Sequence, residues 1–239
     1  MNNKEFIFNE VKKIDIELSE YQVEQFIKYY ELLVEWNSFM NLTGITEFEE
    51  VVVKHFVDSL SLVKGIDLKQ NLSLIDIGTG AGFPGLPLKI AFPNLKVTLL
   101  DSLNKRIKFL DEVIAQLGLI DIDTIHGRAE DFANPDKLRE KYDLCVSRAV
   151  ANLSTLSEYC LPFVNLDGNF ISYKSEKLSE ELDTAKKAIY VLGGKFDKQI
   201  DFNLADGKIY RNLVVIKKVQ KTPKQYPRKA GTASKSPIS

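Results

Sequence analysis

The first 63 residues carry hydrophobic side chains at the three- and four-residue spacing of amphipathic helices. The clearest stripe consists of Val23, Phe26, Ile27, Tyr30, Leu33 and Val34. Ser19 and Gln22 precede this stripe and predict a capping box at the start of its helix. Thr46 and Glu49 predict a second capping box, which opens a helix that runs through Leu60. We therefore expect a helical N-terminal extension over residues 1–65.

From residue 72 onward, short apolar runs alternate with amphipathic stretches. The apolar runs predict strands at 72–77, 95–101, 122–126, 142–147, 168–174, 195–202 and 209–218. The amphipathic stretches predict helices at about 85–92, 103–117, 135–140, 152–162 and 178–191. Such alternation is typical of a parallel sheet that is covered by helices on both faces.

The last two predicted strands break this alternation, because only a short turn at 205–207 joins them. Two strands joined in this way form a hairpin and must be antiparallel. The sequence therefore predicts an α/β domain over residues 66–220. Its Rossmann-like sheet would have seven mostly parallel strands and would end in an antiparallel hairpin.

The charge of the chain is unevenly distributed. Nine of the 32 basic residues, and none of the 33 acidic residues, follow residue 207. A basic end on an acidic body favours contact with a polyanion such as a nucleic acid. The final segment, 221–239, is also rich in Pro, Gly and Ser, so we expect it to be a basic flexible tail.

Composition argues against metal-binding, secreted and membrane classes. Cys145 and Cys160 lack the spacing of a metal site and indicate reduced thiols of a cytoplasmic protein. The sequence has no apolar run long enough to cross a bilayer, and its N-terminus lacks the apolar core of a secretory signal. Nothing in it indicates an obligate oligomer. We expect a cytoplasmic monomer without a metal ion.

The strand predicted at 72–77 ends in a loop with glycines at positions 78, 80, 82 and 85. Glycines allow a sharp turn and a close approach of a ligand, and the helix that follows offers free N–H groups. One interpretation is a G-x-G-x-x-G loop at 80–85, with Asp101 ending the next strand, as in NAD-dependent oxidoreductases. The other is a D-x-G-x-G-x-G loop at 76–82, which resembles motif I of class I methyltransferases.

Four features favour S-adenosylmethionine over a dinucleotide. This cofactor carries an ammonium and a sulfonium but no phosphate, so its loop needs carboxylate and carbonyl partners such as Asp76. Asp101 fits either cofactor, because both have an adenosine ribose diol. The terminal hairpin is foreign to the usual dinucleotide fold, and the loop at 127–131 resembles the methyltransferase loop that flanks the adenine. A second mononucleotide-binding half is also not apparent. A third hypothesis is a non-catalytic RNA or ribosome-assembly binder that retains a vestigial pocket.

The residues around the end of the fourth strand narrow the methyl acceptor. The chain has Ser147 and Arg148 where enzymes that methylate adenine amines commonly have an Asn/Asp-Pro-Pro-aromatic loop. Methylation of a pyrimidine carbon needs a cysteine nucleophile, and Cys145 lies within the strand. The remaining acceptors include ring nitrogens such as guanine N7, which needs no base to remove a proton. The guanidinium of Arg148 matches guanine O6 or a phosphate.

Further motifs give the chain a specific resemblance that covers nearly its whole length. They are Trp36–Asn37 with Phe39, Asn41–Leu42–Thr43, HFVDS at 55–59, DIGTGAGFPG at 76–85, LDS at 100–102, Lys105–Arg106, SRA at 147–149 and PRKAGT at 227–232. Together they resemble the RsmG family, once called glucose-inhibited division protein B. The resemblance implies a class I methyltransferase with S-adenosylmethionine as donor and S-adenosylhomocysteine as product. It also implies that the acceptor is guanine N7 in the 530 loop of 16S rRNA, in the small ribosomal subunit.

The patterns and the resemblance give three overlapping sets of candidate site residues. The candidate catalytic residues are Asn41, Arg128 and Arg148. The candidate cofactor-binding residues are Asp76, Gly78, Thr79, Gly80, Gly82, Phe83, Pro84, Asp101, Ser102, Ala129, Glu130 and Arg148. The candidate RNA-binding residues are Arg128, Arg148, Lys174, Arg211, Arg228 and Lys229. Ser175, directly after Lys174, stands where many relatives have a glycine. His55 is expected to be a hydrogen-bonded structural histidine.

Overall fold

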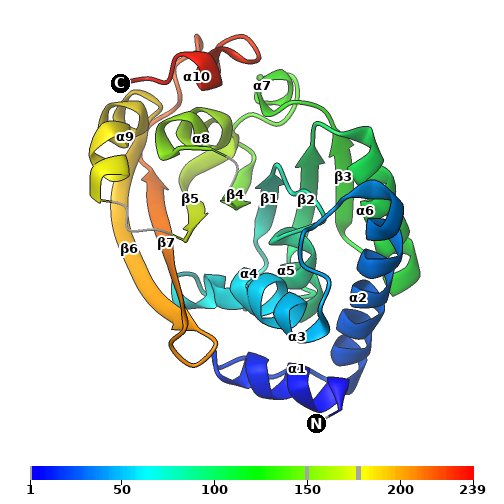
Figure 1. Ribbon diagram of the computed structural model, residues 1–239. Helices are drawn as coiled ribbons and strands as arrows, with labels where there is room; N and C mark the ends of the chain where they lie inside the picture. Colours follow the sequence, from blue (N-terminus) through cyan, green and yellow to red (C-terminus); the bar gives the residue numbers. More distant parts are fainter. Residues whose placement is uncertain (1, 149–150, 176–178) are drawn as a thin grey trace.

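Seven strands of the described residues, 2–148, 151–175 and 179–239, form one sheet in the order β3-β2-β1-β4-β5-β7-β6 (Figure 1). In this computed structural model the strands are β1 (Ser73–Ile77), β2 (Lys96–Asp101), β3 (Ile122–His126), β4 (Tyr142–Arg148), β5 (Val164–Lys174), β6 (Gly194–Leu204) and β7 (Ile209–Lys218). Strands β1 to β5 pair in parallel, and β7 is antiparallel to both β5 and β6. The predicted seven-stranded sheet with a terminal hairpin is confirmed.

The strand order reverses at β1, which has β2 on one side and β4 on the other. Ligands of open α/β sheets bind at the carboxyl ends of the strands beside such a reversal. Asp76 of β1 pairs in register with Val146 of β4, so the two strands end next to each other. The glycine loop and Arg148 therefore share one edge of the sheet.

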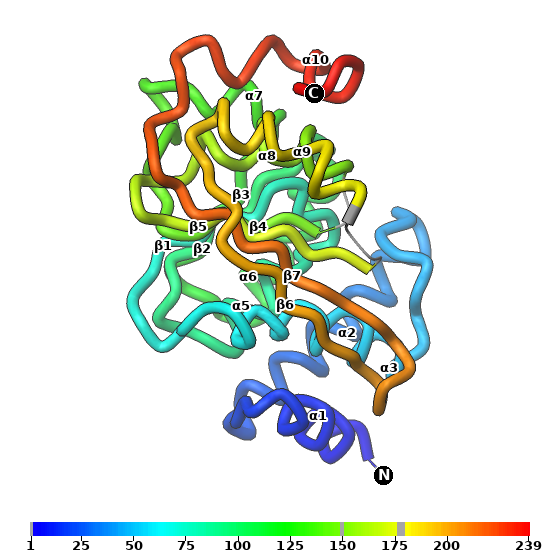
Figure 2. Tube along the Cα trace, turned by 90° about the vertical axis from the view of Figure 1, so that its left-hand side faces the viewer, coloured from blue at the N-terminus to red at the C-terminus, as the bar shows by residue number. Residues whose placement is uncertain are grey.

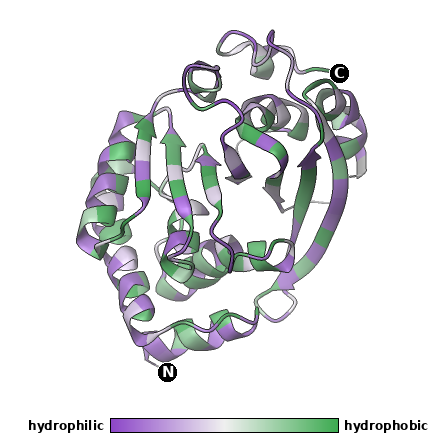
Figure 3. Ribbon diagram, turned by 180° about the vertical axis from the view of Figure 1, so that it is seen from behind, coloured by the Kyte–Doolittle hydropathy of each residue, from purple (hydrophilic) through white to green (hydrophobic). Residues whose placement is uncertain are grey.

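Alternate residues of β1, β2, β5 and β7 face two separate hydrophobic cores. In β1, for example, Leu74 belongs to one core and Ile75 to the other. The longer helices are α1 (Asn3–Lys12), α2 (Glu20–Met40), α5 (Gly85–Ala91), α6 (Asn104–Leu117), α8 (Leu153–Cys160) and α9 (Ser179–Val191). Helices α2, α5 and α6 contribute to the first core, and α8 and α9 to the second. Hydrophobic residues, green in Figure 3, recur along the strands that separate these layers.

The short segments connect these layers. They are α3 (Phe48–Val51), η1 (Val52–Val57), α4 (Asp58–Leu60), η2 (Ser61–Lys64), α7 (Ala129–Phe132), η3 (Leu161–Phe163) and α10 (Thr232–Lys235). Figure 2 shows α1 at one end of the molecule, at the bottom of the view, and α10 at the opposite end, where it contacts α8. The termini therefore lie far apart.

The two predicted capping boxes have different outcomes. The box of Ser19 and Gln22 is confirmed at the start of α2. The second box is wrong, because α3 begins at Phe48 and its N-cap residue, Glu47, makes no side-chain hydrogen bond to the helix. Thr46 lies one residue before the N-cap, where its hydroxyl is out of place to cap the first turn.

The helix predicted to run through Leu60 is also interrupted, because η1 is a π-helical segment. Single π-helical turns are rare in proteins, and those that occur are often found at functional sites. This one contains His55 and leads directly into Asp58, the first residue of α4. Both side chains reach Arg148 at the end of β4. The wider turn therefore lies where the N-terminal helices meet the edge of the sheet.

The predicted helix at 135–140 is wrong, since the chain forms turns there. The backbone N–H groups of Lys137 and Arg139 both donate to the carbonyl of Asn134, at 3.1 and 3.3 Å. The guanidinium of Arg139 donates to the carbonyls of Ala133 and Tyr226, at 3.2 and 2.6 Å. A helix of so few residues has little stability of its own, so tertiary contacts determine this conformation.

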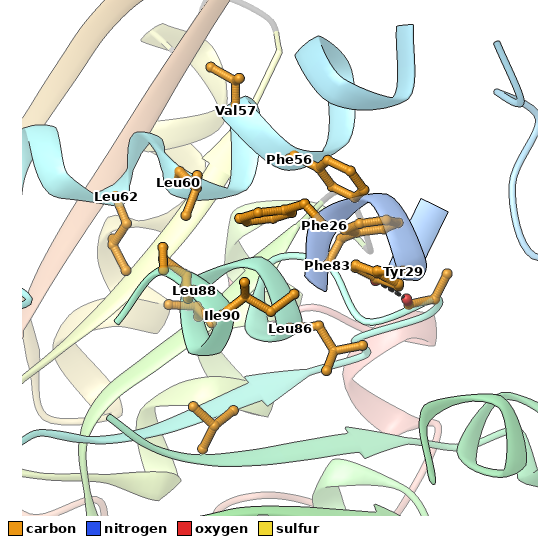
Figure 4. Close-up of a cluster of buried hydrophobic side chains, with 14 of the residues drawn as sticks. Phe26, Tyr29, Phe56, Val57, Leu60, Leu62, Phe83, Leu86, Leu88 and Ile90 are labelled. Atoms are coloured by element: carbon orange, nitrogen blue, oxygen red, sulfur yellow. Dashed lines mark hydrogen bonds between the residues drawn. The ribbon is translucent and has the colours of Figure 1, made fainter. Parts of the chain in front are cut away.

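An aromatic cluster joins α2, η1 and the glycine loop (Figure 4). The ring centroid of Tyr29 lies 5.4 Å from that of Phe56 and 5.5 Å from that of Phe83, and the centroids of Phe26 and Phe56 are 4.9 Å apart. All four side chains are buried. Burial of each such ring contributes about 1.5–3 kcal/mol. The Tyr29 hydroxyl also donates to the carbonyl of Ala81, so α2 holds the glycine loop directly.

Candidate functional site

The glycine loop adopts a backbone conformation that strongly favours glycine at several positions. Gly78, Gly80 and Gly82 have φ angles of 71°, 65° and 100°, in the left-handed region. A Cβ atom on Gly82 would lie 2.4 Å from a Leu86 side-chain carbon and 2.8 Å from the Tyr29 hydroxyl. Gly80, in contrast, faces open space. The loop therefore packs tightly against the helices on one side and leaves its backbone accessible on the other.

Asp76 shapes this loop from inside the protein. Its Oδ2 accepts hydrogen bonds from the Thr79 hydroxyl at 2.7 Å and from the Gly85 N–H, at the start of α5, at 2.9 Å. Burial raises the pKa of its carboxyl to about 7. Its Oδ1 is buried and has no hydrogen-bond partner among the described residues. In the structure Asp76 thus supports the loop and the helix start, and it lines neither of the two cavities described below.

Asp101 connects the loops that follow β1 and β2. Its Oδ2 accepts from the N–H of Gly80 at 2.9 Å, and its Oδ1 accepts from the N–H of Leu103 at 2.9 Å. The Arg106 guanidinium completes the arrangement, with 3.1 Å between Nη1 and Oδ2. The Asp101 side chain is almost fully buried. It is therefore held at the carboxyl edge of the sheet, beside the accessible backbone of the glycine loop.

A cavity of about 210 Å³, here called the Gly78 cavity, lies beyond these loops. Its lining residues come from the ends of β1 and β2, the segment after β3, α8 and the C-terminal tail. They are Ile77, Gly78, Leu100, Ser102, Gly127, Arg128, Ala129, Glu130, Tyr159, Gly231 and Ser234. The structure thus brings together Gly78, Ser102, Ala129 and Glu130 as predicted. The contributions of α8 and the tail to this cavity were not predicted.

A second cavity of about 250 Å³, here called the Arg148 cavity, lies at the same edge on the other side of β1. Its lining residues come from the N-terminal helices and from β4, β5 and β7. They are Ile45, Lys54, His55, Asp58, Arg148, Tyr173, Lys174, Ser175 and Arg211. The structure therefore brings the predicted residues Arg148, Lys174 and Arg211 together in one strongly cationic cavity.

Asp58 lies between two of these cations and was missed in the sequence. Its Oδ2 accepts from Arg148 Nη1 at 3.0 Å, and its Oδ1 accepts from Arg211 Nε at 2.9 Å. The Asp58 side chain is only 4% exposed, whereas those of Arg148 and Arg211 are 15% and 20% exposed. One buried carboxylate thus fixes two guanidiniums and leaves the trio with a net positive charge.

Arg148 also contacts two rings. Its guanidinium carbon lies 4.9 Å from the centroid of Phe83, and the His55 ring stacks on the same Phe83 ring at 4.5 Å. His55 Nε2 and the Thr43 hydroxyl are 2.9 Å apart, and its Nδ1 is 3.3 Å from Arg148 Nη2. His55 is hydrogen-bonded as predicted, and because it also lines the Arg148 cavity, its structural role stays a prediction. The stack also places Phe83 beneath Arg148 and away from the Gly78 cavity.

Lowering the pH from 7 to 5 should destabilise the protein through His55. Burial, followed by the charge of Arg148, lowers the pKa of His55 from 6.5 to about 4. Between these values the unfolded chain binds a proton that the folded protein does not, so stability falls as the pH drops. The loss attributable to His55 between pH 7 and pH 5 should be about 2 kcal/mol.

Urea unfolding of the wild type and of His55→Asn at both pH values measures this loss. Each protein has its own stability at pH 7, so the comparison concerns the change in stability between the two pH values. Stability that falls by the same amount in both proteins would contradict the assignment.

Lys174, Asn41 and Arg128 lie in three different surroundings. Lys174 donates to the carbonyl of Ala151 at 3.0 Å and pairs with Glu181 at 2.6 Å. Asn41 is exposed, ends α2 in the left-handed conformation and lines neither cavity. Arg128 lines the Gly78 cavity, so the structure separates it from Arg148.

The tail residues also differ from each other. Arg228 pairs with Glu158 of α8, whereas Lys229 is exposed. Pro84 follows Phe83 through a cis peptide bond and is the N-cap residue of α5. Ala149, part of the SRA motif, lies outside the described residues.

Three further observations concern the cysteines, metal binding and membrane spans. Cys145 and Cys160 are buried and unbridged, and burial raises the pKa of the Cys145 thiol well above its usual range. Among the residues that the structure describes, no group of three or more His, Cys, Asp or Glu side chains could hold a metal ion. Within the same residues, every helix is too short or too polar to cross a membrane.

Comparisons with known proteins place the chain in a family. Residues 22–210 match the GidB family, described as rRNA small subunit methyltransferase G. The chain is 54% identical over 228 residues to ribosomal RNA small subunit methyltransferase G of Lachnoclostridium phytofermentans, covering 95% of this chain and 94% of that protein. It is 50% identical to the protein of the same name from Alkaliphilus metalliredigens, over the full length of both.

Solved structures share the fold at much lower identity. TYW2 from M. jannaschii, solved in complex with AdoMet, matches with a TM-score of 0.52 at 16% identity, over 63% of this chain and 71% of that one. This likeness concerns the fold of the sheet and its helices. The sequence match over most of its length shows that the chain belongs to the GidB family of rRNA small subunit methyltransferase G proteins.

Proposed function

We propose that this protein transfers a methyl group from S-adenosylmethionine to N7 of a guanine in the 530 loop of 16S rRNA. Its family consists of S-adenosylmethionine-dependent rRNA methyltransferases. The observation that carries the finer proposal is the pair of cavities at one edge of the sheet. The Gly78 cavity offers backbone groups and a carboxylate, and the Arg148 cavity offers fixed cations.

The residues around the Gly78 cavity fit S-adenosylmethionine by the chemistry of their polar groups. The open backbone at Gly80 allows close approach, and the carboxylate of Asp101 holds Gly80 and Leu103 in place beside Ser102, which lines the cavity. Gly78, Ser102 and Ala129 would surround the nucleoside. Bound there, the cofactor supplies a methyl group that its sulfonium has already activated for transfer.

The Arg148 cavity fits an RNA acceptor. Arg148, Lys174 and Arg211 present three cationic side chains from three neighbouring strands, and phosphates and guanine O6 are their natural partners. Guanine N7 carries a free lone pair, so the site has to position the base but does not have to remove a proton. The neutral state of His55 at pH 7 is consistent with a site that needs no added acid.

The structure also supports the exclusion of a thiol-dependent reaction on a pyrimidine carbon. Cys145 lies within β4, is fully buried and has a raised thiol pKa. It is therefore neither accessible nor ionised enough to act as a nucleophile at neutral pH. A ring nitrogen remains the acceptor that best matches the residues present.

Replacing Asp101 with asparagine should weaken the binding of S-adenosylhomocysteine by about tenfold to a hundredfold, because the charge-assisted hydrogen bonds that position Gly80 and Leu103 at the cofactor site are weakened. Isothermal titration calorimetry measures this affinity without RNA. Asp123→Asn, which makes the same change at an exposed position of the neighbouring strand β3, is the matched control. An Asp101→Asn variant that unfolds like the wild type and binds with unchanged affinity would exclude Asp101 from the cofactor site.

The proposed function is tested by transfer of a labelled methyl group to small ribosomal subunits that lack the modification. Digestion of the labelled rRNA should release 7-methylguanosine, and mapping should place it in the 530 loop. Rising salt should weaken binding of the RNA, because the cations of the Arg148 cavity displace counterions from phosphates. Folded protein that binds S-adenosylhomocysteine but transfers no label to any form of the subunit would refute the proposal.

Further measurements address the expected oligomeric state, location and metal independence of the protein. We propose that it acts as a monomer in the cytoplasm and without a metal ion. Transfer should then persist in the presence of a chelator, and sedimentation should give the mass of one chain. Saturable binding of NAD in place of S-adenosylhomocysteine would support an oxidoreductase. Tight RNA binding with no cofactor affinity would support a non-catalytic assembly factor.

A further inference from the structure

The C-terminal segment 228–238 lies against α8, next to α7 (Figures 1 and 2). Its first residue is held by Glu158 of α8. Arg228 donates from Nη2 to Oε2 at 2.6 Å and from Nε to Oε1 at 2.9 Å, and its backbone N–H adds a third bond to Oε1 at 2.8 Å. Glu158 is only 1% exposed. A bidentate pair with a buried carboxylate is among the stronger ionic contacts in a protein.

Further contacts continue along the segment. The Thr155 hydroxyl of α8 donates to the carbonyl of Ala233 at 3.1 Å, and the Ser154 hydroxyl donates to the carbonyl of Ile238. Ala233 is 1% exposed, and Ile238 packs against the second hydrophobic core. The segment is thus attached to α8 at its beginning, middle and end.

The same segment forms one wall of the Gly78 cavity. Gly231 and Ser234 line it together with Gly78 and Ser102. The N–H of Gly231 donates to Glu130 Oε1 at 2.9 Å, which joins the tail to the loop after β3. The wall therefore consists of residues from two distant parts of the sequence.

The charges of the tail divide accordingly. The guanidinium of Arg228 is already paired with a buried acid, whereas Lys229 and Lys235 are exposed. An arginine in this position, with Nε and Nη2 both bonded to Glu158, stabilises the fold of the segment. The basic composition of the tail alone does not reveal this division.

We propose that segment 228–238 is part of the cofactor site, which it closes on the side of the adenosine, and that the Arg228–Glu158 pair keeps it closed. This inference rests on the proposed function only for the identity of the cofactor. Opening of the pair would release the wall and allow the exchange of S-adenosylmethionine and S-adenosylhomocysteine. The tail then contributes to cofactor affinity independently of any contact with RNA.

The first test breaks the pair in the full-length protein. Arg228→Gln should raise the dissociation constant of S-adenosylhomocysteine by about tenfold, measured by calorimetry without RNA, and should speed its release. Lys235→Gln removes the same charge from an exposed position of the tail, and it should leave the dissociation constant unchanged. Equal affinities for the two variants, with Arg228→Gln folded, would overturn the proposal.

The second test fills the cavity and leaves the pair intact. Ser234 is exposed at its rim, so Ser234→Trp should fold normally and should weaken S-adenosylhomocysteine binding by at least about tenfold through steric exclusion. Lys235→Trp, one residue further along, controls for the added ring. Wild-type affinity in Ser234→Trp would place the cofactor elsewhere and overturn the proposal.

These outcomes are distinguishable from failure of the proposed function, because neither test uses an RNA acceptor. If the wild type transfers no methyl group to the small subunit but both variants bind S-adenosylhomocysteine weakly, the role of the tail stands and the acceptor is wrong. If Arg228→Gln instead weakens only RNA binding, Arg228 is a phosphate contact and the role of the tail at the cofactor site is refuted.

Discussion

Replacing Arg148 with alanine should lower methyl transfer by about a hundredfold or more, while the affinity for S-adenosylhomocysteine changes by less than about threefold. Arg148 ends β4 and lines the Arg148 cavity, on the opposite side of β1 from the Gly78 cavity. Its guanidinium is held over Phe83 by Asp58 and by the carbonyl of Lys54. A cation fixed in this way acts on the acceptor, so its loss should affect transfer much more than cofactor binding.

Arg148→Lys is the informative companion variant. It keeps the charge but loses the planar fork that holds Asp58 and would match guanine O6 or a phosphate. Transfer by this variant should lie between that of the wild type and that of Arg148→Ala. Single-turnover assays with saturating cofactor and calorimetry with S-adenosylhomocysteine separate the two effects. Unchanged transfer, or an equal loss of transfer and cofactor binding, would contradict the role given to Arg148.

Replacing Asp58 with alanine should destabilise the protein by about 3 kcal/mol and should also reduce methyl transfer, because removing one partner of a buried pair leaves the other charges uncompensated. Arg148 and Arg211 would then face each other across the space that the carboxylate now occupies. Urea unfolding measures the stability, and the label-transfer assay measures the activity. Both effects should appear in one variant because the same carboxylate supports the fold and orients the cations.

A double-mutant cycle separates these contributions. Arg211→Met removes the second cation and keeps much of its apolar stem, so the double variant Asp58→Ala/Arg211→Met should lose less stability than the two single changes predict together. Asp58→Asn keeps the size of the side chain and can accept from one arginine at a time, so its loss should be smaller. Additive losses would show that Asp58 and Arg211 do not stabilise each other.

The sheet and the glycine loop could be predicted because local sequence determines them. The apolar runs are short and well separated, and the predicted bounds of β3 and β7 match those observed. The errors fell where local sequence is ambiguous. The turns at 135–140 depend on Arg139, whose partners include the tail, and Glu47 replaces Thr46 as the N-cap residue of α3.

The candidate site was predictable in part. Arg148 and Lys174 follow from their place at the ends of strands, where α/β proteins bind ligands. Asp58 was missed because its partners are 90 and 153 residues away in the chain. The signal that could have identified it is an acidic residue within an apolar run of the N-terminal helices.

The tail illustrates the same limitation. Its composition favours flexibility, yet the structure records contacts from Arg228 to Ile238 with α8. The corresponding signal lies in α8 itself. Glu158 is buried there among other buried residues, and its carboxylate needs a partner. A buried acid predicts a cationic partner somewhere in the chain, but the sequence alone does not identify that partner.

The hydrogen bond from Tyr29 to Ala81 has a consequence for the thermodynamics of cofactor binding. Helix α2 contacts the loop through Tyr29, and it is itself fixed by the amides of Gln22 and Gln25, which donate to carbonyls at the ends of α5 and α6. The conformational entropy of the glycine loop is therefore lost when the chain folds, and a ligand meets a preorganised surface. A substitution in α2 that loosened its contact with the loop would lower the affinity for the cofactor without altering any atom that touches the cofactor.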